Sequence, residues 1–232
     1  MIVGVKSDFP PFGYLDGDKE KGLEVDLVHH LAKDLLGNAD AVTLVPVVSS
    51  NRFQYLNTGK VDFLFASVTV TDARKQVVDF SIPYMHSGWR ILVNKSNTTI
   101  HDVADLKGKT VVVIPGTVGE AGIARMVPDA KPLRLTQTSE ALQAVAQGRA
   151  DAFVQDESLL IGLLERYPGY KVVGKAQDDF PIAAACRKGE DGLCEFVSKE
   201  IPKWESDGIL KDEFKKWLHE GYEGFLPVGS KT

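Results

Sequence analysis

One run of hydroxyl, acidic and basic residues, Ser67-Val68-Thr69-Val70-Thr71-Asp72-Ala73-Arg74, contains the groups that bind a carboxylate. It follows an apolar segment, residues 61–66, in which only Asp62 is polar, and this pattern predicts a strand buried on both faces. Thr71 or Asp72 can cap a helix that begins near Ala73 and carries Arg74 in its first turn. A guanidinium binds a carboxylate bidentately, and a helix N-terminus favours negative charge. The run therefore indicates either an anion site or an ordinary capped helix with Arg74 in solvent.

Composition places the chain among globular proteins of ordinary make-up. Its 232 residues are 44% hydrophobic and 25% charged, enough for a full core and for two modest domains. A net charge of −5, without a run of Lys or Arg, argues against a nucleic-acid partner. No stretch approaches the roughly 18 apolar residues of a membrane span.

Two features bear on the cellular compartment. An apolar strand directly after Met1 suits a mature secreted domain whose signal peptide has been removed, although a cytosolic protein could also begin in this way. Cys186 and Cys194 are too few for a four-ligand metal site, and no metal or cofactor is expected. In an oxidising compartment the two cysteines could form a disulfide, whereas in the cytosol they would be free thiols.

The order of predicted elements indicates an α/β fold with two similar halves. Each half alternates strands and helices in a β-α-β-α-β pattern, which is typical of a mostly parallel sheet flanked by helices. In the first half, Pro10-Pro11 predicts a loop after the first strand, and the apolar spacing of residues 23–36 predicts a helix that ends at Gly37. The junctions Gly59-Lys60-Val61-Asp62 and Gly148-Arg149-Ala150-Asp151 repeat the same helix–glycine–basic–apolar–Asp order. We therefore expect two lobes, residues 1–87 plus 184–232 and residues 88–183, joined by two crossing strands that act as a hinge.

Several motifs, in this order and spacing, match a known family. They include Gly22-Leu23-Glu24-Val25-Asp26-Leu27, the run 67–74, Asp79-Phe80-Ser81-Ile82-Pro83-Tyr84, Pro115-Gly116-Thr117 and Asp151-Ala152-Phe153-Val154-Gln155-Asp156. The whole chain resembles the periplasmic solute-binding proteins of polar amino-acid ABC importers, the bacterial family 3 type. This resemblance implies the two-lobed type II "Venus flytrap" fold of periplasmic binding proteins.

The resemblance also implies how the protein works. A monomer that is no enzyme would capture a free amino acid by hinge closure and deliver it to the membrane permease of an ABC importer. Its location would be the periplasm, or the outer face of a Gram-positive membrane through a lipid anchor.

Site roles follow from the resemblance by position. Arg74 would clamp the α-carboxylate of the ligand, helped by the Val68–Thr69 backbone and by the backbone of Thr117 and Val118. The family often has Thr at position 118, so a side-chain contact from Val118 is not expected. The energetics of burying charge favour the same assignment, because each charge of a zwitterion that leaves water needs a partner of opposite charge or hydrogen-bonding groups.

The α-ammonium would meet three oxygens: the carbonyl of Ser67, the hydroxyl of Thr69 and the carboxylate of Asp156. Phe9 stands where the family places an aromatic ring over the aliphatic part of the ligand.

Two cations, Lys6 and Arg52, suggest which amino acid binds. Relatives that bind basic amino acids commonly carry an acid at the position of Lys6, whereas relatives specific for glutamate and aspartate carry basic residues at both positions. We therefore expect glutamate or aspartate, with glutamine or another neutral polar amino acid as the alternative. The competing interpretation is that Lys6 and Arg52 form ion pairs with Asp8, Glu24 or Asp26 inside the first lobe.

Two other classes of protein share this fold. A cyclohexadienyl-dehydratase-like enzyme would need paired carboxylates, for which Asp156, Glu157 and Glu120 are available. A ligand-binding domain of a receptor is the third interpretation.

Overall fold

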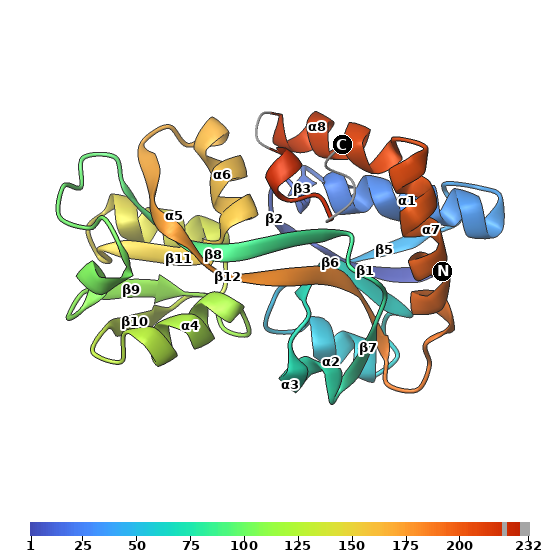
Figure 1. Cartoon of the computed structure of the whole chain (residues 1–232), viewed down its shortest axis with the longest axis horizontal. Helices are drawn as coiled ribbons and strands as arrows, with labels where there is room; N and C mark the ends of the chain where they lie inside the picture. Colours follow the sequence, from blue (N-terminus) through green and yellow to red (C-terminus); the bar gives the residue numbers. More distant parts are fainter. Residues whose placement is uncertain (220–221, 228–232) are drawn as a thin grey trace. The chain divides into compact units, whose positions relative to one another are not determined.

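A computed structural model describes residues 1–219 and 222–227 of the chain. The chain divides into two compact units, which are described separately: unit 1 comprises Met1–His86 and Phe180–Thr232, and unit 2 comprises Ser87–Asp179. Two strands, β8 (Met85–Asn94) and β12 (Tyr170–Arg187), run from one unit into the other (Figure 1). The fold class is α/β, as predicted.

The sheet of unit 1 has parallel strands in the order β5-β1-β6. The C-terminal part of β12 runs antiparallel to β6, and β7 runs antiparallel to β12. The bounds are β1 Ile2–Lys6, β5 Thr43–Val47, β6 Phe63–Thr69 and β7 Val78–Phe80. Pro46, which cannot donate to a ladder, is tolerated because β5 is an edge strand.

Helices cover both faces of this sheet, as right-handed crossovers in opposite directions require. Figure 1 shows α1 and α8 on the face opposite α2. The helices are α1 Leu23–Leu36, α2 Arg52–Asn57, α3 Asp72–Lys75, α7 Gly192–Ser206 and α8 Ile209–Leu218, followed by the 3₁₀ turn Tyr222–Gly224. Helix α1 ends at the predicted Gly37, whose positive φ of 74° forms the left-handed cap.

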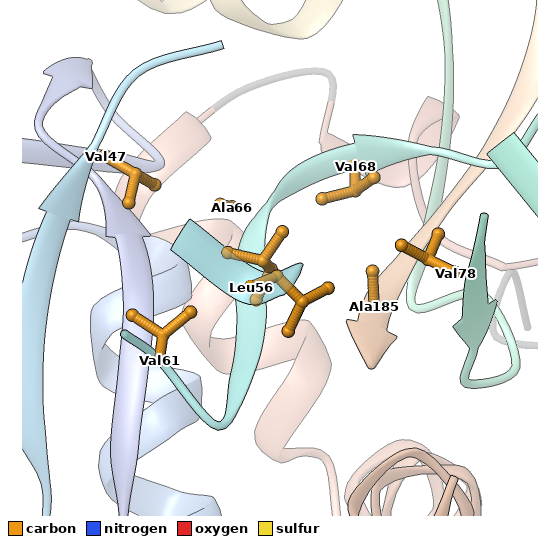
Figure 2. Packing of buried hydrophobic residues seen from close by; sticks show 8 residues of the cluster. Val47, Leu56, Val61, Ala66, Val68, Val78 and Ala185 are labelled. Atoms are coloured by element: carbon orange, nitrogen blue, oxygen red, sulfur yellow. The ribbon is translucent and has the colours of Figure 1, made fainter. Parts of the chain in front are cut away.

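Buried aliphatic side chains from α2 and the sheet form a core cluster in unit 1 (Figure 2). Its members are at most 1% exposed: Val47, Leu56, Val61, Leu64, Ala66, Val68, Val78 and Ala185. The side chain of Val68, a predicted site residue, is therefore buried in this core, and only its backbone is available to a ligand.

A small antiparallel sheet follows β1, where the sequence predicted a loop. Its strands are β2 Asp8–Phe9, β3 Gly13–Asp16 and β4 Lys19–Lys21. Strands of two to four residues are too short to show an alternating pattern, which is why the sequence did not reveal them. Gly13 lets β3 approach β1 closely, because a Cβ there would lie 2.4 Å from the carbonyl oxygen of Lys6.

Unit 2 has its own sheet in the order β10-β9-β11-β8, with β8 antiparallel to β11. The strands are β9 Thr110–Val113, β10 Lys131–Arg134 and β11 Ala152–Asp156. The helices are α4 Val118–Met126, α5 Thr138–Ala146 and α6 Glu157–Arg166, with a 3₁₀ turn at Val103–Leu106. In Figure 1, α4 lies on the face of this sheet opposite α5.

The repeated junction seen in the sequence has the same hydrogen bonds in both units. Asp62 Oδ2 accepts from the N–H of Ile2 at 2.7 Å, and Asp151 Oδ2 accepts from the N–H of Thr110 at 2.8 Å. Each aspartate thus ties the start of its unit's first parallel strand to the corner after a helix.

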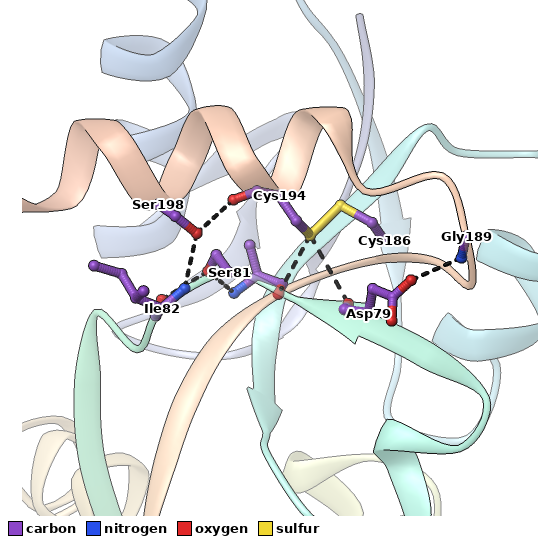
Figure 3. The surroundings of a disulfide bond; sticks show 8 residues. Asp79, Ser81, Ile82, Cys186, Gly189, Cys194 and Ser198 are labelled. Atoms are coloured by element: carbon purple, nitrogen blue, oxygen red, sulfur yellow. Dashed lines mark hydrogen bonds between the residues drawn. A yellow bond between two sulfur atoms is a disulfide. The ribbon is translucent and has the colours of Figure 1, made fainter.

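Cys186 on β12 and Cys194 on α7 form a disulfide in unit 1 (Figure 3). Ser198 on the same helix accepts a hydrogen bond from the N–H of Ile82 at 3.0 Å, so α7 is held to two segments of the unit. Among the described residues, no helix is long and apolar enough to span a membrane.

Candidate functional site

Unit 1 buries an unusual set of charged side chains at the ends of its strands and helices. Lys6, Glu24 and Arg52 are at most 3% exposed, and Arg74 is half-buried. They come from β1, α1, α2 and α3, which the sheet brings to the C-terminal ends of its parallel strands. Ligands of open α/β sheets bind at such ends.

Arg52 is bound to the backbone at the end of β6. Its Nη1 donates to the carbonyl oxygens of Ala66 at 2.7 Å and Ser67 at 3.0 Å. Burial lowers the pKa of Arg52 to about 10, against the opposing attraction of Glu24. Arg52 therefore holds the backbone of the predicted binding run through Nη1, and its direct contact with a ligand's side chain stays a prediction.

Glu24 fixes the same backbone from the other side. Its Oε1 accepts from the N–H of Ser67 at 2.7 Å, from the Ser67 hydroxyl at 2.8 Å and from the Tyr84 hydroxyl. Ser67 has a φ of 48°, which non-glycine residues rarely adopt, and these bonds hold it there. Burial raises the pKa of Glu24, with the hydrogen bonds opposing it.

Arg74 lies in the first turn of a short helix, as predicted. The Thr71 hydroxyl caps this helix by accepting from the N–H of Arg74 at 3.3 Å, and Nη1 of Arg74 donates to the Thr69 carbonyl at 2.7 Å. Burial lowers the pKa of Arg74 to about 9, and repulsion from the charge of Arg52 is the second cause. A lowered pKa means that the cation is under-stabilised, so an anion bound beside it would be favoured.

Lys6 already has an anionic partner. Its Nζ lies 2.7 Å from Asp8 Oδ1 and donates to Ser49 Oγ at 3.1 Å. The same ammonium is 5.1 Å from the centre of the Phe9 ring, which is itself 4% exposed. Burial lowers the pKa of Lys6, and the attraction of Asp8 opposes this change. The ion pair of Lys6 with Asp8, which was the alternative to a contact between Lys6 and the ligand, is therefore present.

In unit 2, Asp156 is the last residue of β11 and caps α6. Its Oδ1 accepts from Ser87 Oγ at 2.6 Å, Ser158 Oγ at 2.5 Å and the N–H of Ser158 at 3.1 Å. Burial raises the pKa of Asp156, against the opposing hydrogen bonds. A cation beside Asp156 would favour its charged form and oppose this rise in pKa.

Thr117 and Val118 stand at the N-terminus of α4. The Thr117 hydroxyl accepts from the N–H of Glu120 at 3.3 Å and donates to the Ile114 carbonyl at 2.8 Å. The N–H of Thr117 also donates to the Ile114 carbonyl, at 3.3 Å. The first amides within a helix have no intrahelical acceptor, so the turn at Val118 suits an anion. Gly119 packs this turn against β11, because a Cβ there would contact the Val154 carbonyl at 3.4 Å.

The predicted residues therefore fall into two groups. Lys6, Phe9, Arg52, Thr69 and Arg74 lie together in unit 1 with Ser67 and the backbone of Val68, and Thr117, Val118 and Asp156 belong to unit 2.

Three further polar residues belong to these groups. Asp8 and Glu24 were named from the sequence only as possible ion-pair partners of Lys6 and Arg52, and Glu24 also shares a helix face with Leu27, Val28 and Leu31. The third, Gln155, was not singled out as a site residue. It is 2% exposed, and its Nε2 has no hydrogen-bond partner among the described residues.

No group of three His, Cys, Asp or Glu side chains suited to a metal ion occurs within residues 1–219 and 222–227.

Comparison with known proteins identifies the class. Residues 1–220 match the model of bacterial extracellular solute-binding proteins, family 3, and the chain belongs to this family. Over 223 residues, it is 31% identical to the ABC transporter glutamine-binding protein GlnH of Bacillus subtilis (strain 168), covering 95% of this chain and 81% of that protein. It is 32% identical to the L-cystine-binding protein TcyJ of Escherichia coli (strain K12), covering 94% and 82%.

A solved relative has the same fold along the whole chain. The solute receptor for L-cysteine of Neisseria gonorrhoeae superposes with a TM-score of 0.92 at 36% identity, covering 98% of this chain and 95% of that one. The glutamate/aspartate import solute-binding protein of E. coli (strain K12) is 28% identical, over 94% of this chain and 76% of that protein. The protein is thus an amino-acid-binding protein of the ABC-importer type, and its named relatives are transport proteins.

Proposed function

We propose that this protein captures a neutral polar L-amino acid, of the glutamine or cyst(e)ine kind, outside the cytoplasm and delivers it to the permease of an ABC importer. The observation that carries the choice of ligand is the ion pair between Lys6 and Asp8. It removes one of the two cations on which the expectation of glutamate or aspartate depended.

The partners of the buried cations in unit 1 support this choice. Lys6 is paired with Asp8, and the charge of Glu24 attracts Arg52. Arg74 is the cation that we assign to the single α-carboxylate of a neutral amino acid. The second carboxylate of glutamate would compete with Asp8 for the ammonium of Lys6, and its desolvation would cost several kcal/mol.

The backbone of the ligand is assigned to the predicted residues. Arg74, with the amide of Thr69 and the α4 N-terminus at Thr117–Val118, receives the carboxylate. Asp156, the Thr69 hydroxyl and the Ser67 carbonyl receive the ammonium, and Phe9 lies against the side chain. The raised pKa of Asp156 supports this role, because burial disfavours its ionised form and a bound cation would stabilise that form.

Units 1 and 2 correspond in this proposal to the two lobes of a solute-binding protein. The carboxylate and the ammonium of one ligand then draw on groups of different units, so that ligand binding favours a closed state. We further propose that the protein acts as a monomer in the periplasm or at the outer face of a Gram-positive membrane.

Isothermal titration calorimetry with glutamine, cystine, cysteine, glutamate, aspartate and arginine tests the proposal. We expect a neutral amino acid to bind at least about tenfold more tightly than glutamate, since tenfold corresponds to about 1.4 kcal/mol. Tighter binding of glutamate or aspartate would restore the original expectation. Absence of binding to every amino acid would overturn the proposal as a whole.

A further inference from the structure

The two segments that connect the units touch each other inside unit 2. Gly88 on β8 lies against β12, because a Cβ at Gly88 would be 2.4 Å from the carbonyl oxygen of Asp178 and 2.8 Å from that of Gln177. Gly88 is the second residue of unit 2, and Asp178 is the last but one. Both connections are thus fixed to each other close to where they leave the unit.

Asp178 also joins these connections to helix α4. Its Oδ2 accepts from the buried indole Nε1 of Trp89 on β8 at 3.2 Å. Arg125 on α4 donates from Nη2 to both carboxylate oxygens, at 3.1 and 2.8 Å. One carboxylate therefore binds β8, β12 and α4 together.

The packing beneath this carboxylate is tight. Gly122 of α4 lies on the Trp89 indole, and a Cβ at Gly122 would be 2.5 Å from that ring. Asp178 itself has a φ of 60°, a conformation that Asp and Asn tolerate better than other side chains. Such outliers persist only where the surroundings enforce them, and the carboxylate of Asp178 is bound here by both Trp89 and Arg125.

We infer that Asp178 is a positioning residue for ligand binding: through Arg125 and Trp89 it fixes α4, and with it the Thr117–Val118 amides, to the strand that leads to unit 1. The inference depends on the proposed function, in which those amides receive the ligand's carboxylate. A helix of nine residues transmits a displacement at Arg125 to its own N-terminus as a rigid rod.

A second exposed ion pair of unit 2 provides a control. Nζ of Lys107 lies 3.4 Å from Oδ2 of Asp129, and the side-chain exposures are 76% and 64%, against 60% and 30% for Arg125 and Asp178. Lys107 and Asp129 lie outside α4 and outside both connecting strands.

The experiment compares Arg125→Leu, Asp178→Asn and Lys107→Leu by calorimetry and by stopped-flow dissociation of the amino acid that the wild type binds most tightly. Asn at position 178 keeps an acceptor for Trp89 and tolerates the backbone conformation, so that only the charge for Arg125 is lost. We expect Arg125→Leu and Asp178→Asn each to weaken binding about two- to fivefold, mainly through faster dissociation, which is the range of an exposed ion pair. The double variant is expected to bind no more weakly than either single variant.

Lys107→Leu is expected to leave affinity unchanged. Equal losses of affinity in Arg125→Leu and Lys107→Leu would overturn the inference, because they would assign Arg125 a merely structural role. Unchanged affinity in Arg125→Leu would do the same. Either result leaves the proposed function standing, whereas a wild type that binds no amino acid removes the proposed function itself.

Discussion

The ammonium of Lys6 lies 2.7 Å from Oδ1 of Asp8, with both side chains at most 8% exposed. This pair determines how many cations unit 1 can offer a ligand. Replacing Asp8 by Asn frees the charge of Lys6 while keeping the shape of the side chain. We expect Asp8→Asn to shift the preference toward glutamate over glutamine by about tenfold, the low end of a charge-assisted hydrogen bond.

Paired titrations of glutamate and glutamine measure this shift. Asp16→Asn is the control, because Asp16 pairs with Lys21 in solvent, where both side chains are at least 45% exposed. An equal change in the affinities for both ligands would contradict the role of the Lys6–Asp8 pair.

Arg74 is expected to be required for every ligand. Arg74→Ala removes the cation whose pKa burial and Arg52 lower to about 9, and with it the partner proposed for the α-carboxylate. Loss of a charged hydrogen-bonding group of this kind costs about 3–5 kcal/mol, so affinity should fall by at least about a hundredfold. Calorimetry checks this, with Arg74→Lys expected to retain part of the affinity. Wild-type affinity in Arg74→Ala would show that the carboxylate binds elsewhere.

Arg52 is expected to act on stability and on all ligands alike. Arg52→Ala leaves the Ala66 and Ser67 carbonyls without their Arg52 donor and removes one of the two cations that attract Glu24, the other being Lys6. We expect the free energy of unfolding in urea to fall by about 2–4 kcal/mol. Affinities for glutamine and glutamate should fall together. A loss confined to glutamate would instead support the direct role that the sequence first suggested for Arg52.

Binding should weaken in acid because of Asp156. Burial raises its pKa above the usual 3.8 in the free protein, and a bound ammonium would lower it again. Affinity should therefore be full above the raised pKa and decline as the pH falls through it, and binding should release a proton near that pH. Calorimetry between about pH 4 and pH 7, in buffers of different ionisation enthalpy, measures both effects. Asp156→Asn should bind weakly at every pH, without the proton release; an unchanged pH profile in this variant would remove Asp156 from the assignment.

Two glycines of α4 should respond oppositely to alanine. At Gly122 a Cβ would lie 2.5 Å from the buried Trp89 ring, whereas at Gly119 it would make an ordinary contact at 3.4 Å. Overpacking costs about 1–3 kcal/mol, and Gly→Ala in a helix otherwise gains up to about 1 kcal/mol. Gly122→Ala should lower the unfolding temperature and Gly119→Ala should raise it or leave it unchanged. A stable Gly122→Ala would show that the indole can move.

Local sequence signals predicted α1 and the cap of α3, but not the full length of β12, which extends over Tyr170–Arg187. The apolar spacing of residues 23–36 and the following Gly37 gave α1 to the residue, and Thr71 was one of two predicted caps for the helix that carries Arg74. The Gly-basic-apolar-Asp junctions predicted the repeated architecture. Each junction is a short run of neighbouring residues, and its Asp bonds to the start of one strand, so that the pattern is visible in the sequence.

Partners of buried charges were harder to predict. Lys6 had three candidate acids, and its choice of Asp8 depends on a short sheet that no periodicity reveals. Arg52 binds backbone carbonyls at the end of β6. Every residue has such a carbonyl, so the sequence does not indicate which one Arg52 binds. Ligand specificity depends on such choices, which is why the family could be recognised from the sequence more readily than the amino acid.

The matching bonds of Asp62 and Asp151 suggest how the chain is assembled. Unit 2 is one uninterrupted stretch, Ser87–Asp179, and it carries its own copy of the tie between first strand and corner. It is thus organised as a module inserted into a host chain that has an equivalent tie of its own at Asp62. The chain enters this module once and leaves it once, so an exchange of the module between related proteins changes the backbone connection at two points.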